Sequence, residues 1–386
     1  MSNLSSSEEV TQAVEEDHGV EEEQVDDYYD KLTHPFDPNK IRVTTEPKTI
    51  ERLFKRINLG EIDLAPEFQR RARLWKPHRK GQLIESILLR IPLPVFYVAA
   101  TEDNNWSVVD GLQRLTIIHD FKSGQFPLTG LEYLNKLEGM SFSMLPRSMR
   151  RRIEDTSLVL NIIQPGTPDE VMINIFKRLN TGGLPLKGQE IRNALYKGPA
   201  RKFLASMVAD GAFQRATARS VSDARMDAQE CILRFSAFHL NDWHLYKRND
   251  LDAYLGEAMR QINGIGEAGL KELSANLREA MGTAAEIFDT DAFRKRYDEN
   301  GTRRPVSKAL FEVWSVNLAR LDARQKSLLV ERKQSVKKAF MELMRTDSIF
   351  EDSISTSTGT VRKVHKRFGT IEDLIANVLK EIPSRN

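Results

Sequence analysis

Short apolar runs with strand-like spacing mark the first half of the chain. β-branched and aromatic residues alternate with polar ones or form brief runs, which predicts strands at residues 62–66, 95–99, 106–109 and 158–163. Apolar residues recur at helical spacing over residues 48–57, 78–89 and 114–121. Because the turn residues Asn104 and Asn105 separate two of these strands, we expect residues 95–99 and 106–109 to pair as a hairpin.

The pattern becomes helical after Pro168 and stays so almost to the end of the chain. Helical spacing covers residues 171–179, 189–196, 199–208, 223–240, 252–262, 269–288, 307–321, 327–344 and 371–382. The Ser- and Thr-rich stretch 352–360 predicts a flexible loop. We therefore expect an α+β protein, with a small mixed sheet and helices over about residues 41–165, followed by a mainly α-helical C-terminal half.

Charge is distributed unevenly, although the formal net charge is only +2. Residues 1–30 contain eleven Asp or Glu and no Lys or Arg, which leaves 57 basic against 44 acidic residues in the rest of the chain. A basic body favours a polyanionic partner, most often nucleic acid, unless its Lys and Arg simply solvate helices. The acidic stretch 1–40 is expected to be disordered; it either occupies a basic groove and suppresses non-specific binding or is a solvated tail without a role.

Several classes of site and location are excluded by what the sequence lacks. It has no run of about 18 apolar residues, so no membrane span is expected, and residues 1–10 show no signal peptide, so we expect a cytoplasmic protein. The single cysteine, Cys231, excludes an internal disulfide and a Cys-based zinc site, and its helical spacing with Phe235 and Phe238 predicts a buried thiol. There is no P-loop motif and no cluster of His residues, so we expect neither a metal nor a cofactor.

The most informative segment is Asp110-Gly111-Leu112-Gln113-Arg114, at a predicted strand-to-helix junction. Gly111 permits a tight turn, and the following helix N-terminus offers free N–H groups to an anion. Asp110 can act as a base or stabilise a cation, while Gln113 and Arg114 can bind a phosphate or a base edge. The structural alternative is that Asp110 caps the helix and Arg114 forms a salt bridge.

Further motifs flank this segment in a fixed order. Upstream are residues 66–71, Trp75, 82–88 and 91–94; downstream are residues 176–183, Leu186 and 189–193. The series, over about residues 47–196, resembles the large family marked by an Asp-Gly-Gln-Gln-Arg motif, which forms the N-terminal domain of GmrSD-type type IV restriction enzymes and of phosphorothioate-sensing defence enzymes. This resemblance implies a ParB/sulfiredoxin-like fold, and we expect an acidic tail at 1–40, a ParB-like domain at 41–200 and a helical domain at 201–386.

The resemblance also implies a nucleotide- or DNA-handling pocket. Matching positions of this chain are Asp110, Gly111, Gln113, Arg114, Gln69, Arg70, Asn180, Gly182, Gly183, Glu190, Arg192 and Asn193. Leu112 departs from the pattern, because the family usually has Gln there, and this puts a direct transfer of nucleotide hydrolysis in doubt. A second departure is that the HNH nuclease motif carried by restriction members is missing here.

Three basic clusters fit a DNA partner, although each can also be a solvated face. They are Arg70, Arg71, Arg73, Lys76, Arg79 and Lys80 around Trp75; Arg147, Arg150, Arg151 and Arg152; and Arg362, Lys363, Lys366 and Arg367. Trp75 or Phe68 can stack on a displaced base, or pack in the core. The helical half is expected to supply grip on DNA and a wall of the pocket.

These features lead to three hypotheses about function. The first is an antiphage hydrolase acting on double-stranded phage DNA with modified bases, for example glucosylated hydroxymethylcytosine, that excises the modified base without a metal. Its catalytic residues would be Asp110, Gln113 and Arg114. Gln113 and Asn180 would contact the base edge, and Arg114 and Arg70 would hold the flanking phosphates. Glu85 is a possible second carboxylate unless it lies on the helix surface. The second is a nucleotide-dependent nickase or NTPase, and the third is a non-catalytic sensor of modified DNA.

Overall fold

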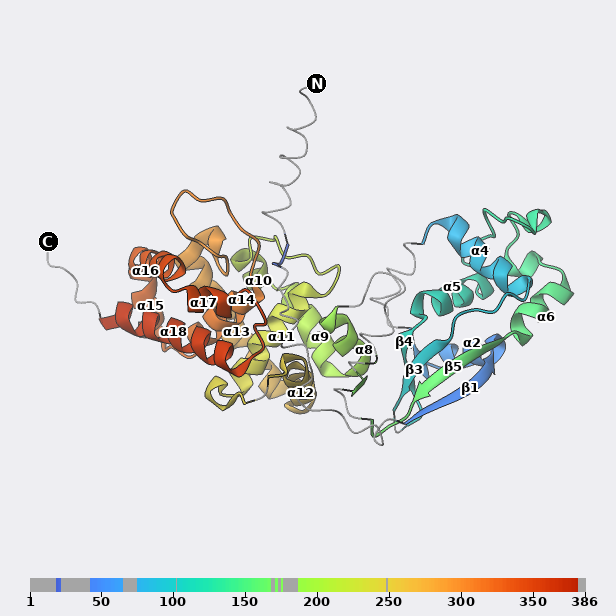
Figure 1. Ribbon diagram of the computed structural model, residues 1–386, viewed down its shortest axis with the longest axis horizontal. Helices are drawn as coiled ribbons and strands as arrows, with labels where there is room; N and C mark the ends of the chain where they lie inside the picture. Colours follow the sequence, from blue (N-terminus) through green and yellow to red (C-terminus); the bar gives the residue numbers. More distant parts are fainter. Residues whose placement is uncertain are drawn as a thin grey trace, which may run out of the picture. The chain divides into compact units, whose positions relative to one another are not determined.

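A computed structural model describes residues 19–21, 42–64, 75–101, 103–167, 171–172, 175, 187–247 and 249–380. The chain forms two compact units, Phe36–Leu186 and Lys187–Asn386 with Met1–Pro35. The first holds the strands and the second is helical (Figure 1), which confirms the α+β fold class. The expected domain boundary at residue 200 stays a prediction.

Five strands form one mixed sheet in the first unit. They are β1 (Val43–Thr49), β2 (Ile62–Asp63), β3 (Phe96–Ala100), β4 (Trp106–Asp110) and β5 (Ser157–Ile163), in the spatial order β1-β5-β3-β4-β2. β3 pairs antiparallel with β4, with Val98 opposite Val108, so the predicted hairpin is confirmed. β3 runs parallel to β5, β2 runs parallel to β4, and β1 is antiparallel to β5.

β1 is a strand that the hydrophobic pattern does not reveal. Its residues are exposed or only partly buried, as suits an edge strand, so they show no clear alternation. The helix predicted from residue 48 begins instead at Ile50, as α2 (Ile50–Asn58), because Lys48 and Thr49 still pair with β5. The Thr49 side chain accepts a hydrogen bond from the Arg52 amide, which fixes the start of the helix.

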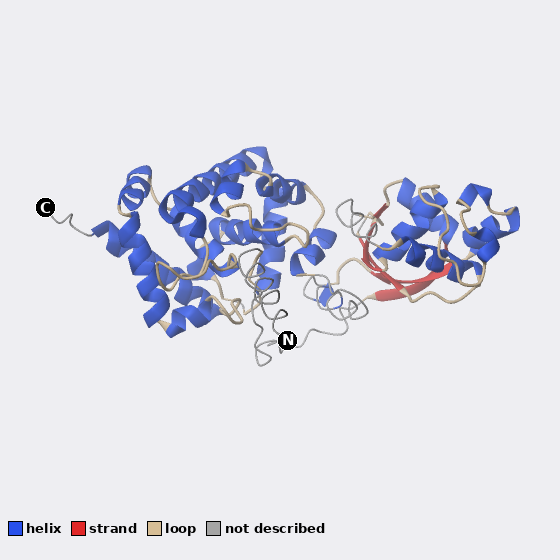
Figure 2. Ribbon diagram, turned by 90° about the horizontal axis from the view of Figure 1, so that it is seen from above, coloured by secondary structure: helices blue, strands red, loops and turns tan. Residues whose placement is uncertain are grey.

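Helices cover one face of the sheet (Figure 2). Besides α2 they are α4 (Pro77–Leu88), α5 (Leu112–Lys122) and α6 (Arg147–Asp155), with short 3-10 turns at Asn135–Leu137 and Phe142–Met144. Ile84 of α4, Phe121 of α5, Ile153 of α6 and Leu160 of β5 are buried in the shared core. Burying each such side chain contributes about 1.5–3 kcal/mol.

Glu85 of α4 forms hydrogen bonds with the loop that follows α5. Its side chain is 3% exposed, and its oxygens accept hydrogen bonds from the amides of Glu132, Tyr133 and Leu134 at 2.7–3.0 Å. Burial by itself would raise the pKa of Glu85, but these three amides lower it below its ordinary value. Glu85 is therefore neither a free second carboxylate nor a surface residue, and both expectations for it are wrong.

The second unit is a bundle of helices around its own core. They are α8 (Gly188–Leu195), α9 (Pro199–Val208), α10 (Gly211–Ala216), α11 (Asp227–Leu240), α12 (Leu251–Gly264), α13 (Gly266–Phe288), α14 (Lys308–Ala319), α15 (Ala323–Glu331), α16 (Lys333–Thr346), α17 (Ser348–Ser353) and α18 (Val361–Lys380), with 3-10 turns at Trp243–Leu245 and Asp289–Asp291. α11 and α14 are buried on nearly all sides, and Cys231 of α11 is a buried free thiol as predicted. Most predicted helices are confirmed; the one at 327–344 breaks at Arg332, and the one at 171–179 lies largely outside the described residues.

Buried charges overturn two expectations near the C-terminus. Arg367 is fully buried, pairs with Glu312 through two guanidinium nitrogens, and donates to the carbonyls of Ser353 and Thr358. The predicted flexible loop at 352–360 is therefore held in place, with Ser353 and Thr358 buried. Lys363 is also buried and forms an ion pair with Asp352. Lys363 and Arg367 are therefore not available to DNA, and the expectation that the third basic cluster binds DNA is wrong for these two residues.

Candidate functional site

A β-bulge precedes the Asp110–Arg114 segment. Tyr97 pairs with Asp110 and Val98 with Val108, so Val109 has no partner across the ladder. An extra residue of this kind bends its strand and re-aims the side chains next to it. The bulge therefore determines where Asp110 points as β4 ends.

Gly111 joins β4 to α5 in a conformation that other residues rarely adopt. Its φ is 90°, and it is the N-cap residue of α5. A Cβ at this position would lie 2.4 Å from Cδ1 of Phe96 and 3.1 Å from a terminal nitrogen of Arg114. Glycine is thus required by both the backbone and the close approach of its neighbours, and Gly111, not Asp110, caps the helix.

Arg114 ties the end of β4 to the segment before β3. Its guanidinium donates to Oδ2 of Asp110 at 3.0 Å, to the Val95 carbonyl at 3.3 Å and to the Pro94 carbonyl, and its Cζ lies 4.4 Å from the centre of the Phe96 ring. Burial lowers the pKa of Arg114, while the Asp110 carboxylate acts in the opposite direction. Arg114 therefore forms the salt bridge that the sequence offered as a structural role for this residue.

Asp110 and Gln113 retain groups for a ligand. The Asp110 side chain is 32% exposed, and within the described part of the chain its Oδ1 has no recorded partner. Gln113 is exposed, and its Oε1 accepts a hydrogen bond from the indole Nε1 of Trp75. The structure thus places Trp75 at the motif, with the exposed Lys76 next to it at the start of α4.

Exposed cations lie on two helices of the sheet-containing unit. Lys76 and Arg79 are exposed at the N-terminal end of α4, and Arg147 and Arg151 are exposed on α6. Arg152 also donates to the Leu88 carbonyl at the end of α4, at 3.0 Å. Lys76, Arg79, Arg147 and Arg151 therefore present positive charge to solvent, as contact with phosphates requires.

Other predicted site residues lie elsewhere in the chain. Gln69, Arg70, Arg71, Asn180, Gly182 and Gly183, together with Phe68 and Arg73, are outside the described residues. Arg192 and Asn193 lie on α8 in the helical unit, where they are 1% and 2% exposed. Burial of this degree keeps both side chains from contact with DNA in this structure.

Arg192 is instead the centre of a buried polar cluster. It donates to Asp252 at 2.6 Å, to Glu230 at 3.1 Å and to Gln189 at 2.8 Å. Burial alone would raise the pKa of Glu230, but Lys308, Arg192 and Arg234 lower it. No sequence feature reveals this cluster, because its members come from α8, α11, α12 and α14 and show no joint spacing.

No group of three or more His, Cys, Asp or Glu side chains in the described ranges has the arrangement of a metal site. No helix in those ranges is both long enough and apolar enough to cross a membrane.

Comparison with known proteins identifies a similar family for part of the chain. No curated protein matches the chain. Residues 50–197 match the family described as the N-terminal domain of the GmrSD restriction endonuclease, a match that includes the Asp110–Arg114 segment and α8. Residues 50–197 of this chain are therefore similar to a GmrSD-type N-terminal domain.

Proposed function

We propose that this protein is an antiphage defence enzyme that acts on modified DNA and excises the modified base by hydrolysing its N-glycosidic bond. The family match supports an action on DNA within a restriction-type defence system, since the matching family is a restriction endonuclease domain. The observation that favours base excision is the partly exposed Asp110 carboxylate, one oxygen of which is held by Arg114. The other oxygen has no partner among the described residues, which leaves it available to a substrate or water.

The chemistry needs a carboxylate beside the sugar of an extruded nucleotide. The bond between C1′ and the base nitrogen breaks, and the base leaves with its electron pair and takes up a proton. Asp110 stabilises the positive charge that develops on the sugar and orients the water whose hydroxyl bonds to C1′. The products are a free base and an abasic site.

Neighbouring groups divide the remaining tasks. Arg114 is a positioning residue, because its guanidinium is committed to Asp110 and to two backbone carbonyls. Gln113 presents its amide to a base edge, and Trp75, which donates to Gln113, offers an indole ring for stacking. Lys76, Arg79, Arg147 and Arg151 contact backbone phosphates.

The remaining predicted site residues form two groups. Gln69, Arg70, Arg71, Asn180, Gly182 and Gly183 enter it only through the family match. Arg192 and Asn193 contribute by holding α8 within the helical unit, since both are buried there.

The test is incubation of the full chain with unmodified, hydroxymethylated and glucosylated phage DNA, followed by mass spectrometry of released bases. We expect release from modified DNA by the wild type and by Asp103→Ala, which removes an exposed carboxylate of the same hairpin. Asp110→Ala should lose release. Strand breaks or triphosphate turnover without base release would instead assign a nickase or NTPase, and tight binding without chemistry a sensor.

A further inference from the structure

Three residues of the acidic N-terminal stretch lie against the helical unit. The Gly19 amide donates to the Ser220 carbonyl at 2.9 Å, the Glu21 amide to Val306 at 2.9 Å, and the Val306 amide to Gly19 at 3.3 Å. Val20 forms a parallel β-bridge with Val306 and packs partly buried against the helical core. This pairing is the hydrogen-bond pattern by which an extended peptide adds to a strand-like edge.

An ion pair fixes the acidic side chain of this tripeptide. The Glu21 carboxylate lies 2.6 Å from the Lys295 amine, whose side chain is 7% exposed. The amine also donates to Oγ of Ser355 at 2.7 Å. Because a buried ammonium is strongly destabilised without an anion, Lys295 needs Glu21 or a replacement for it.

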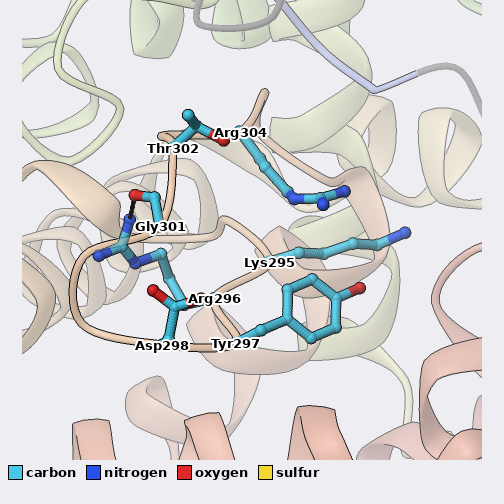
Figure 3. A pocket seen from close by; sticks show the side chains of 7 residues that line it. All are labelled: Lys295, Arg296, Tyr297, Asp298, Gly301, Thr302 and Arg304. Atoms are coloured by element: carbon cyan, nitrogen blue, oxygen red, sulfur yellow. Dashed lines mark hydrogen bonds between the residues drawn. The ribbon is translucent and has the colours of Figure 1, made fainter.

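Lys295 also lines a pocket that carries more positive charge. Its lining residues are Lys295, Arg296, Tyr297, Asp298, Gly301, Thr302 and Arg304. Figure 3 shows the Lys295 side chain extended between those of Arg304 and Tyr297, with all three pointing the same way. The Arg304 guanidinium is exposed and lies 5.0 Å from the centre of the Tyr297 ring.

We propose that this place is a docking groove for an extended acidic peptide, and that its ligand is the chain's own Gly19–Glu21. Glu15, Glu16 and Asp17 precede the docked residues, and Glu22 and Glu23 follow them. Lys295 is buried while Glu21 is docked, so release of Glu21 is what opens it, beside the exposed Arg304, to a DNA phosphate. Docking therefore limits non-specific binding; this competition rests on the proposed function, whereas the docking does not.

Two variants with the same charge change separate docking from net charge. Glu21→Ala removes the carboxylate on Lys295, and Glu9→Ala removes a carboxylate of the same stretch outside the docked tripeptide. Hydrogen exchange of the full chain reports docking through the amides of Gly19, Glu21 and Val306. We expect Glu21→Ala to lose protection there and Glu9→Ala to keep it; full protection in Glu21→Ala would overturn the proposal.

Fluorescence anisotropy with a labelled, unmodified DNA duplex tests the competition. Release of the groove should add about one phosphate contact, which steepens the salt dependence by about 0.9 in log K against log salt. Glu21→Ala should therefore bind several-fold more tightly at low salt than Glu9→Ala. Equal affinity of the two variants would overturn the competition alone, while a wild-type chain that binds no duplex at low salt would overturn it together with the proposed function.

Discussion

Substitution of Gly111 by alanine tests how the candidate site is built. The new Cβ would lie 2.4 Å from Cδ1 of Phe96, a separation that forces the ring or the backbone to move. The Arg114 guanidinium is stacked on that ring and would be 3.1 Å from the same Cβ, so it is displaced as well. Gly124, just after α5, is a matched control, since its φ is 74° and a Cβ there would meet nothing within 4 Å.

The two substitutions differ only in the steric clash of the new Cβ, which occurs at Gly111 and not at Gly124. Placing a Cβ in the left-handed region costs about 1–2 kcal/mol, and both variants carry this cost. Overpacking adds about 1–3 kcal/mol only at Gly111. We therefore expect Gly111→Ala to lower the free energy of unfolding of the sheet unit by about 2–5 kcal/mol, against about 1–2 kcal/mol for Gly124→Ala.

Hydrogen exchange of slowly exchanging amides in β3, β4 and α5 is a suitable assay, because it measures this unit separately from the helical one. Gly111→Ala should also reduce base release, since it moves the partner of Asp110. Equal losses of stability in the two variants would refute the close packing of Phe96 and Arg114 around Gly111.

Two further predictions concern buried charges. Glu85→Gln should destabilise the sheet unit by about 1–3 kcal/mol at neutral pH, because an amide accepts fewer of the three backbone hydrogen bonds. Because the pKa of Glu85 is lowered in the folded state, its contribution to folding stability is complete above pH 4.5, its ordinary pKa. This stability is lost as the pH falls through the lower pKa of the folded state. Acid unfolding should therefore be steeper in the wild type than in Glu85→Gln. Arg367→Met should cost about 3–5 kcal/mol, because it removes from the buried Glu312 the cation that contacts Oε1 and leaves it only Arg234, 3.5 Å away, as an ion-pair partner among those described here. Adding Glu312→Leu should restore part of that loss in hydrogen exchange of α14 and α18.

The parts of the fold that local patterns encode were predictable. The hairpin of β3 and β4 follows from two short apolar runs and a turn, and most helices follow from their spacing. The edge strand β1 is not evident from the sequence because it is polar and exposed, and the helix α6 is not because four of its nine residues are Arg and it buries only Ile153. The break at Arg332 was missed because apolar spacing continues on both sides of it.

The candidate site was predictable only where its residues are close in sequence. Asp110, Gly111 and Arg114 form one local unit, so their junction and ion pair could be anticipated. The contact of Trp75 with Gln113 and the burial of Arg192 depend on long-range packing, which residue spacing does not encode. Glu85 shows the same limit, because the amides that bind it lie 47–49 residues away.

The most direct test of the account is the release of a modified base from glucosylated phage DNA by the purified full chain, measured by mass spectrometry. We expect release by the wild type and by Asp103→Ala, and none by Asp110→Ala. Undiminished release by Asp110→Ala would contradict the assignment of Asp110 as the catalytic carboxylate.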